Sequence, residues 1–235
     1  MSTNRNTSLH PLTKAEAIFG FCYILAQQFL IPMLLEQIFD LCGFPKTSLW
    51  MNFAFFACNF ILVIFVFHKF LAASLRQLGK RFGHVLGDCV AAFLLYMASN
   101  VFVSLIINLC FPSFANANDA YIQTLANDRF WVIFASTVVL VPLAEEVLFR
   151  GVIFGTLYRW NRPLAYIFST LIFGGIHIVG YLFTEGYTWV DAAVSMLQYL
   201  PAGFCLAWVY ADTNTIFAPV LVHTIVNLIA VMAMR

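Results

Sequence analysis

The sequence is poor in charge: Asp, Glu, Lys and Arg make up only 10% of its 235 residues. A soluble domain carries roughly a quarter charged residues, whereas 62% of this chain is hydrophobic. These numbers exclude an ordinary soluble domain, a disordered chain, collagen and a small disulfide scaffold. The net charge of +1 gives no electrostatic basis for nucleic acid as a partner. The class that remains is a polytopic helical membrane protein.

Uncharged stretches mark the predicted spans. No charged residue occurs in 47–68, 89–118, 130–144, 163–184, 192–211 or 213–234. Crossing a bilayer as a helix takes about 20 apolar residues, and continuous apolar runs favour helices over a barrel. We therefore predict an all-α bundle with spans near 15–41, 49–68, 86–110, 130–158, 163–181, 188–210 and 214–234. The count is seven, or eight if the first stretch is two elements.

The chain reads as one integral-membrane domain over 1–235, with a cytoplasmic tail at 1–14 and the chemistry-bearing helices at 130–235. Segment 69–86 alternates leucines with four cations, which is typical of a helix on an anionic leaflet. A solvated basic loop is the alternative. Segment 111–128 has the Asn, Asp and Pro content of an exposed turn region.

Loop cations predict the orientation. With the N-terminus inside, the cytoplasmic side receives Arg5, Lys14, Lys69, Arg76, Lys80, Arg81, Arg159 and Arg162, and the other side receives Lys46, Arg129 and Arg235. Cytoplasmic loops carry the excess of Lys and Arg. The N-terminus is therefore predicted to be cytoplasmic and the C-terminus outside.

Ionisable residues inside the spans suggest function, because each costs on the order of 3 kcal/mol at bilayer depth. The fourth span carries Glu145, Glu146 and Arg150. Glu146 and Arg150 are four residues apart, so they share a helix face and can pair. Glu145 points about 100° away from Glu146 and is free for another partner.

Glu145 and Glu146 lie about fourteen residues, or roughly 21 Å at ~1.5 Å per residue, from the cytoplasmic end of their span. Two other spans carry polar residues whose depth agrees with this to within a turn or two. His177 lies in the fifth span, and His223 and Asn227 lie on one face of the seventh. Three helices are therefore predicted to bring a carboxylate, two imidazoles and an amide into one buried layer.

Such a layer supports peptide hydrolysis in two ways. Glu145 could take a proton from a water that His177 holds, while His223 and Asn227 donate to the oxyanion. Alternatively, Glu145, His177 and His223 form a three-ligand zinc set with an open fourth position. Other proteolytic signatures are absent: the sequence has no H-E-x-x-H, no G-x-G-D and no G-x-S-x-G.

Other interpretations stay open at this stage. A lone intramembrane histidine is usually a hydrogen-bonded core residue, and the Glu146–Arg150 pair could be purely structural. The same groups could form a relay in a proton-coupled transporter or channel. A non-catalytic immunity protein with an unused site is a further reading.

Three motifs resemble those of the CAAX protease and bacteriocin-processing family, also called CPBP or Abi. They are E-E-x-x-x-R at Glu145, Glu146 and Arg150, F-x-x-x-H at Phe173 and His177, and H-x-x-x-N at His223 and Asn227. They occur in the family's order and on separate predicted spans. The resemblance covers roughly 145–227, and the first 130 or so residues match no motif.

The resemblance implies an intramembrane endopeptidase of a bacterial plasma membrane. Its conical cavity is expected to reach the site from the cytoplasmic side and the lipid. Glu145 and His177 would activate water, His223 and Asn227 would hold the oxyanion, and Glu146, Arg150 and Phe173 would support the site. Family members are described both as metalloproteases and as metal-free glutamic proteases, so zinc is a possible cofactor and none is certain. The implied substrate is a membrane-bound or prenylated protein or peptide, either of the C-a-a-X type or in bacteriocin processing and self-immunity. Nothing in the sequence predicts an oligomeric state.

Overall fold

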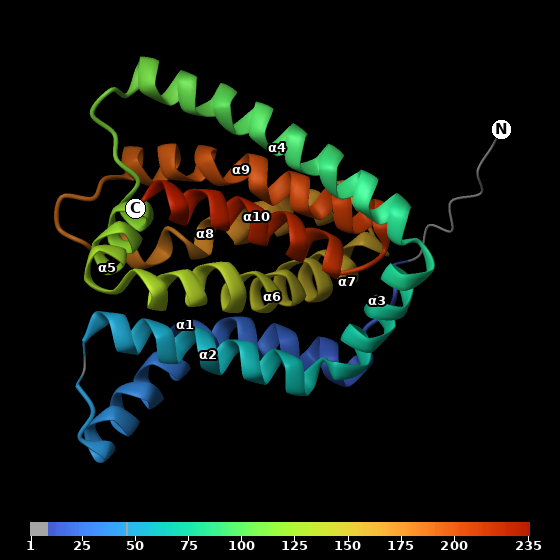
Figure 1. The fold of residues 1–235 in the computed structure, drawn as a ribbon, viewed down its shortest axis with the longest axis horizontal. Coiled ribbons are helices and arrows are strands. Elements are labelled where there is room, and N and C mark those ends of the chain that lie inside the picture. Colours follow the sequence, from blue (N-terminus) through green and yellow to red (C-terminus); the bar gives the residue numbers. More distant parts are fainter. Residues whose placement is uncertain (1–8, 46) are drawn as a thin grey trace.

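The computed structural model describes residues 9–45 and 47–235, and within these ranges every regular element is a helix (Figure 1). Residues 1–8, most of the predicted cytoplasmic tail, lie outside the described residues. Arg5 and Lys46, two of the cations used for the predicted orientation, are also outside them.

The helices follow the predicted spans closely. Their bounds are α1 Lys14–Cys42, α2 Ser48–Val66, α3 His68–Lys80, α4 Phe82–Cys110, α5 Ala117–Phe134, η1 Ala135–Leu140, α6 Val141–Glu146, η2 Val147–Phe154, α7 Gly155–Tyr158, α8 Arg162–Ile176, η3 Val179–Tyr181, α9 Trp189–Thr213 and α10 Phe217–Ala233. Five helices are long and apolar enough to cross a membrane: α1, α2, α4, the continuous helix from α5 to α7, and α9. The shorter apolar helices α8 and α10 occupy the other two predicted positions. The all-α polytopic bundle is confirmed, and the first stretch is one helix that continues through Pro32.

The helix that contains α6 is central to the bundle. It contacts α10 on one side and α2 on another, while its continuation η2 packs against α8 and α1 (Figure 1). Helices α4, α8 and α10 pack around α9. The helix with the two adjacent glutamates therefore packs against α10, which carries His223, and against α8, which ends just before His177.

The bundle has two distinct ends (Figure 1). At one, here called the α3 end, the backbone N–H of His10 donates to Asn214 Oδ1 over 2.7 Å, so the start of the described chain lies beside the turn between α9 and α10. At the other, the α5 end, Gln123 Nε2 donates to the carbonyl of Met234 over 3.1 Å. The two termini of the described chain therefore lie at opposite ends.

The prediction of an exposed turn over 111–128 is wrong for most of that segment, because α5 begins at Ala117. Asn116 caps this helix, its side-chain oxygen accepting from the N–H groups of Asn118 and Asp119. Asn and Asp favour helix caps as well as turns, so their content alone did not distinguish the two. A break at Arg129, with φ −143° and ψ 78°, separates the first part of α5 from the membrane helix, which is where the fourth span was predicted to begin.

Segment 69–86 is helical, as its first interpretation predicted: α3 ends at Lys80 and α4 begins at Phe82. The solvated loop is excluded, and the position of α3 on a leaflet stays a prediction. One boundary differs from the prediction. The helix at the fifth predicted span, α8, ends at Ile176, although the predicted span of apolar residues continues to 181. Gly174 and Gly175, two poor helix formers, come just before this end, and a 3₁₀ turn follows at Val179–Tyr181.

Candidate active site

The backbone around the two adjacent glutamates is wider than an α-helix. Residues 135–140 form π-helical turns, and the N–H of Val141 accordingly donates to Ser136, five residues earlier. Pro142 explains this widening, because it has no N–H for the carbonyl of Val138 and its ring would clash there in an α-helix. A second π-helical segment, 147–154, follows directly. Such segments are rare and frequently mark functional sites.

Glu146 and Arg150 form the predicted ion pair, and both side chains are fully buried. Arg150 Nη1 donates to Glu146 Oε1 over 3.1 Å, and Nη2 donates to the carbonyl of Gly203 over 3.3 Å. The guanidinium carbon lies 4.3 Å from the centroid of the Phe173 ring. A Cβ at Gly203 would lie only 2.6 Å from Thr170 Cγ2, so the missing side chain permits the close approach of α8 and α9 beside the arginine.

His223 joins α10 to the central helix between the two glutamates. Its Nδ1 lies 2.8 Å from Glu146 Oε1, and its Nε2 lies 4.0 Å from Glu145 Oε2. A carboxylate accepts hydrogen bonds, so Nδ1–H is the donor to Glu146. The sequence predicted only Arg150 as a partner for Glu146, and this second partner is new.

His177 lies directly after the last residue of α8. Its Nδ1 is 2.8 Å from the carbonyl of Phe173, and its ring stacks on Tyr199 with centroids 4.5 Å apart. A carbonyl can only accept, so Nδ1 carries the proton, and the neutral ring keeps a lone pair on Nε2. The ring is therefore fixed in orientation with one nitrogen available as a base.

Asn227 lies one turn beyond His223 on α10. Its Nδ2 donates to the carbonyl of Thr137 over 2.8 Å. An amide nitrogen has two N–H groups, so one remains for a ligand. The carbonyl of Thr137 therefore orients the amide without using its whole donor capacity.

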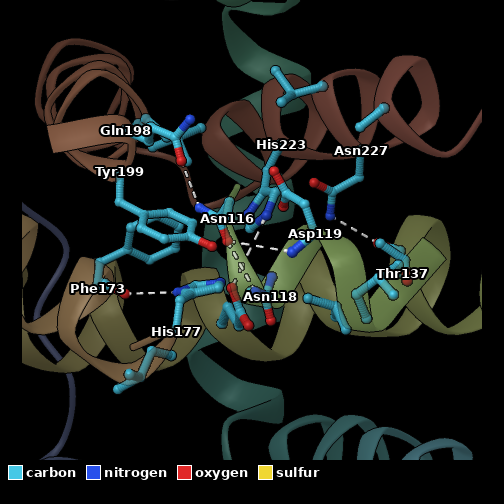
Figure 2. A pocket seen from close by; sticks show the side chains of 18 of the residues that line it. Asn116, Asn118, Asp119, Thr137, Phe173, His177, Gln198, Tyr199, His223 and Asn227 are labelled. Carbon is cyan, nitrogen blue, oxygen red and sulfur yellow. Dashed lines mark hydrogen bonds and ion pairs between the residues drawn. The ribbon is translucent and has the colours of Figure 1, made fainter. Parts of the chain in front are cut away.

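The site residues form two groups according to whether they line a cavity of about 500 Å³. Glu145, His177, His223 and Asn227 all line it, whereas Glu146 and Arg150 do not and lie behind its wall. Figure 2 shows His177 on one side of the cavity and Asn227 on the opposite side. The structure thus brings the four residues with predicted catalytic roles to one cavity and places the predicted supporting pair behind them.

The predicted zinc set is not assembled. Among the described residues, His84, Asp88 and Asp212 are the group of His, Cys, Asp or Glu whose ligand atoms all lie within 4.8 Å of one another. Glu145, His177 and His223 do not form such a group. The geometry therefore does not fit a zinc ion shared by these three side chains.

Several site residues were not found from the sequence. They are Tyr199, which stacks on His177, Thr137 and Gly203, which accept through their carbonyls, and Asn116, which donates to Gln198 over 2.6 Å. Backbone carbonyls carry no signal in a sequence. Tyr199 belongs to a predicted span without Asp, Glu, Lys, Arg or His at mid-depth, so the search for charged residues and histidines did not find it.

The cavity extends toward the α5 end. Asn116, Asn118, Asp119 and Met234 line it there, and no residue of α3 or α7 does. The described cations predicted to be cytoplasmic belong to α3 or to the ends of α1, α4, α7 and α8 that lie at the opposite, α3 end (Figure 1). If the α3 end and the N-terminus are cytoplasmic, the cavity opens toward the outside. The expected cytoplasmic N-terminus and the expected access from the cytoplasm therefore conflict in this structure.

Comparisons with known proteins concern the same part of the chain. Residues 127–229 match a family model described as Rce1-like, type II CAAX prenyl endopeptidase Rce1-like. A 90-residue stretch is 34% identical to the UPF0177 protein YxdF of Lactococcus lactis subsp. lactis (strain IL1403), covering 38% of this chain and 43% of the relative. An 87-residue stretch is 34% identical to the "Putative membrane peptidase YdiL" of Bacillus subtilis (strain 168), covering 37% of this chain and 30% of the relative. No solved structure matches the chain.

The chain spans less than half the length of these curated relatives, and the matched segment contains all three motifs. The family model and the Bacillus subtilis relative both carry names of peptidases. The predicted resemblance is confirmed as a similarity: residues 127–229 are similar to the Rce1-like family model, which is consistent with the CAAX protease and bacteriocin-processing family.

Proposed function

We propose that this protein is an intramembrane endopeptidase that hydrolyses a peptide bond of a membrane-associated peptide or protein. One observation carries the proposal: Glu145 Oε2 accepts no hydrogen bond from any described residue, at the wall of a cavity that His177 and His223 also line. A buried carboxylate oxygen without a partner is costly. A reacting water would satisfy it.

Water activation follows from this arrangement. A water in the cavity donates one hydrogen bond to Glu145 Oε2 and the other to Nε2 of His177, the ring nitrogen that Phe173 leaves free. Glu145 takes the proton while the water oxygen attacks the carbonyl carbon. A positioned general base of this kind contributes about 10²–10⁴-fold to a rate.

The oxyanion of the tetrahedral intermediate needs donors that are already in place. His223 and the second N–H of Asn227 supply them in our proposal. Because Nδ1–H of His223 donates to Glu146, Nε2 can donate to the oxyanion only when the ring is doubly protonated, and the Glu146 carboxylate stabilises that cationic ring. With Glu145, Glu146 and Arg150 ionised, a protonated His223 brings the net charge of these four groups to zero.

Collapse of the intermediate completes the reaction. The carbon–nitrogen bond breaks, and the leaving amine takes the proton that Glu145 received, relayed through Nε2 of His177. The products are a carboxylic acid and an amine, and both residues return to their starting states. The proposed steps use only side chains of this chain, and the zinc alternative is tested by the chelation experiment below.

The shape of the cavity favours hydrolysis over an open channel. An open channel needs a continuous path to both sides of the membrane. The described lining runs from the Glu145 layer to the α5 end and includes no residue of α3 or α7 at the other end. A cavity closed at one end suits a site that admits a peptide and releases its fragments.

The direct test is cleavage by the purified protein, in lipid nanodiscs, of a library of internally quenched peptides with and without a lipid anchor. We expect protein treated with o-phenanthroline to keep its cleavage activity, in a sample in which elemental analysis finds no bound zinc. Loss of activity on chelation, restored by zinc, would instead support a metalloprotease. Proton flux in liposomes without any cleavage would support a transporter, and neither activity would support the non-catalytic reading.

We also propose that the C-terminus and the cavity mouth face the outside of the plasma membrane, since the predicted excess of cations lies at the α3 end. Alkaline phosphatase fused after Arg235 should therefore be active in cells, while green fluorescent protein fused there should be dark. Cys110, exposed where α4 ends, should react with a membrane-impermeant maleimide in intact cells when it is the sole cysteine. The reverse pattern would place the cavity mouth in the cytoplasm.

A further inference from the structure

The charges that line the cavity have one sign. Its described lining includes two carboxylates, Glu145 and Asp119, two histidines, and no Lys or Arg. Glu145 belongs to the reacting layer, whereas the proposed mechanism does not use Asp119. Even with His223 protonated, as the proposed mechanism requires, two carboxylates face one cation, and the described lining has a net negative charge while His177 is neutral.

Asp119 has a fixed position at the cavity. It lies in the first turn of α5, where its backbone N–H donates to Asn116 Oδ1 over 3.3 Å. Asn116 in turn donates to Gln198 of α9 over 2.6 Å, which ties this turn to the opposite wall. Figure 2 shows Asn116 and Asp119 together in front of the layer that holds His223.

The carboxylate of Asp119 is available to a ligand. The residue is exposed, yet it lines the cavity, and it is close enough to His177 to interact with it electrostatically. Within residues 9–45 and 47–235 no Lys, Arg or His lies within ion-pair distance of it. A peptide that reaches Glu145 from the α5 end passes this unpaired negative charge.

Polar side chains beside Asp119 suit an extended backbone. Asn116, Asn118 and Gln198 line the same part of the cavity and offer amide donors and acceptors. Such groups pair with peptide N–H and C=O groups without regard to sequence. Selection among peptides would then depend on the one charged side chain, Asp119.

We propose that Asp119 is a specificity-determining residue that selects peptides with a Lys or Arg side chain near the scissile bond. The inference rests on the proposed endopeptidase function and deepens it. Opposite charges at close range attract strongly where water is partly excluded. The preferred substrate is thus a cationic peptide segment cut at an internal bond.

The same charges disfavour a free C-terminal carboxylate close to the cut. Three extended residues span only about 10 Å, so the terminal carboxylate of a substrate trimmed by three residues would lie in or at this cavity. It would meet two carboxylates there and no Lys or Arg. A substrate that continues beyond the cut, or ends in an amide, avoids this repulsion.

The test uses one peptide that the full-length protein cleaves, with Lys, Gln or Glu placed in turn at each of the three positions on either side of the cut. At one position or more we expect kcat/KM to be about tenfold higher for Lys than for Gln, and lower again for Glu. Asp119→Asn should abolish this ranking, Asp119→Lys should reverse it, and Asp119→Glu should keep it. A peptide ending three residues after the cut should be cleaved faster as its amide than as its free acid.

Asp128→Asn and Asp128→Lys are the matched controls, because Asp128 is an exposed aspartate of the same helix that does not line the cavity. Both should keep the ranking. Equal cleavage of the Lys and Glu peptides by the wild-type protein would overturn the inference about Asp119. A ranking that survives in Asp119→Asn would also overturn it. Either result would leave the endopeptidase proposal unaffected. If Asp119→Asn does not fold, the comparison of Asp119→Glu with wild type and the amide–acid pair decide the matter. A wild-type protein that cleaves no peptide would overturn both proposals.

Discussion

Replacing Glu145 with Gln should lower kcat/KM for peptide cleavage by at least about 100-fold, the lower end of what a general base contributes. Glutamine has nearly the same shape as glutamate and can still accept hydrogen bonds, but it cannot take a proton from water near neutral pH. The side chain is 16% exposed, at the cavity wall, and its Oε2 has no hydrogen-bond partner among the described residues. Removing its charge should therefore change stability little. Activity is measured in nanodiscs and stability by thermal melting.

The control for this substitution is Glu185→Gln, which neutralises an exposed glutamate in the segment between η3 and α9. It should leave both activity and melting temperature unchanged. Activity within a few-fold of wild type in Glu145→Gln would remove Glu145 as the base. A large drop in melting temperature would instead assign Glu145 a structural role.

The spans and the motif residues could be predicted because their signals are local. A gap in charge marks a span wherever its neighbours lie in space, and a four-residue spacing places Glu146 and Arg150 on one face before any packing is known. Matched depth along three helices was also enough to expect Glu145, His177 and His223 in one layer. The structure brings all three to one cavity.

The contacts that orient the site could not be predicted, because they join distant residues or use the backbone. His223 donates to Glu146 across 77 positions, and Arg150 reaches the carbonyl of Gly203 across 53. The register between two helices decides such contacts, and spacing within one helix says nothing of it. Asp119 was missed for another reason: its Asn-rich surroundings indicated a turn, and the folded chain uses them as a helix cap at the cavity.

The two adjacent glutamates illustrate how position on a helix separates roles. Glu146 is fully buried and accepts hydrogen bonds from Arg150 and His223. Glu145 faces the cavity, and its Oε2 accepts no hydrogen bond from the described residues. Substitutions at neighbouring positions should therefore fail in different ways. Glu145→Gln should give a folded, inactive protein, and substitutions in the pair behind it should act on folding first.

Breaking the Glu146–Arg150 pair should be strongly destabilising. Arg150→Met keeps an unbranched side chain without the guanidinium, so Glu146 stays buried without its cation, and Glu146→Gln leaves the buried guanidinium without its carboxylate. Removing one member of a buried pair typically costs about 3–5 kcal/mol. We expect each variant to lose free energy of unfolding of that order, measured by SDS titration in mixed micelles.

The double variant Glu146→Gln with Arg150→Met decides whether the cost comes from the stranded charge. It removes both charges, so it should recover much of the stability that either single variant loses, because replacing a buried pair by neutral groups is often close to neutral. Peptide cleavage should stay low in the double variant, since His223 no longer has a carboxylate at its Nδ1. Arg159→Met, at an exposed arginine of the same helix region, should leave the free energy of unfolding unchanged. Single variants as stable as wild type, or a double variant with additive losses, would show that Glu146 and Arg150 do not depend on each other.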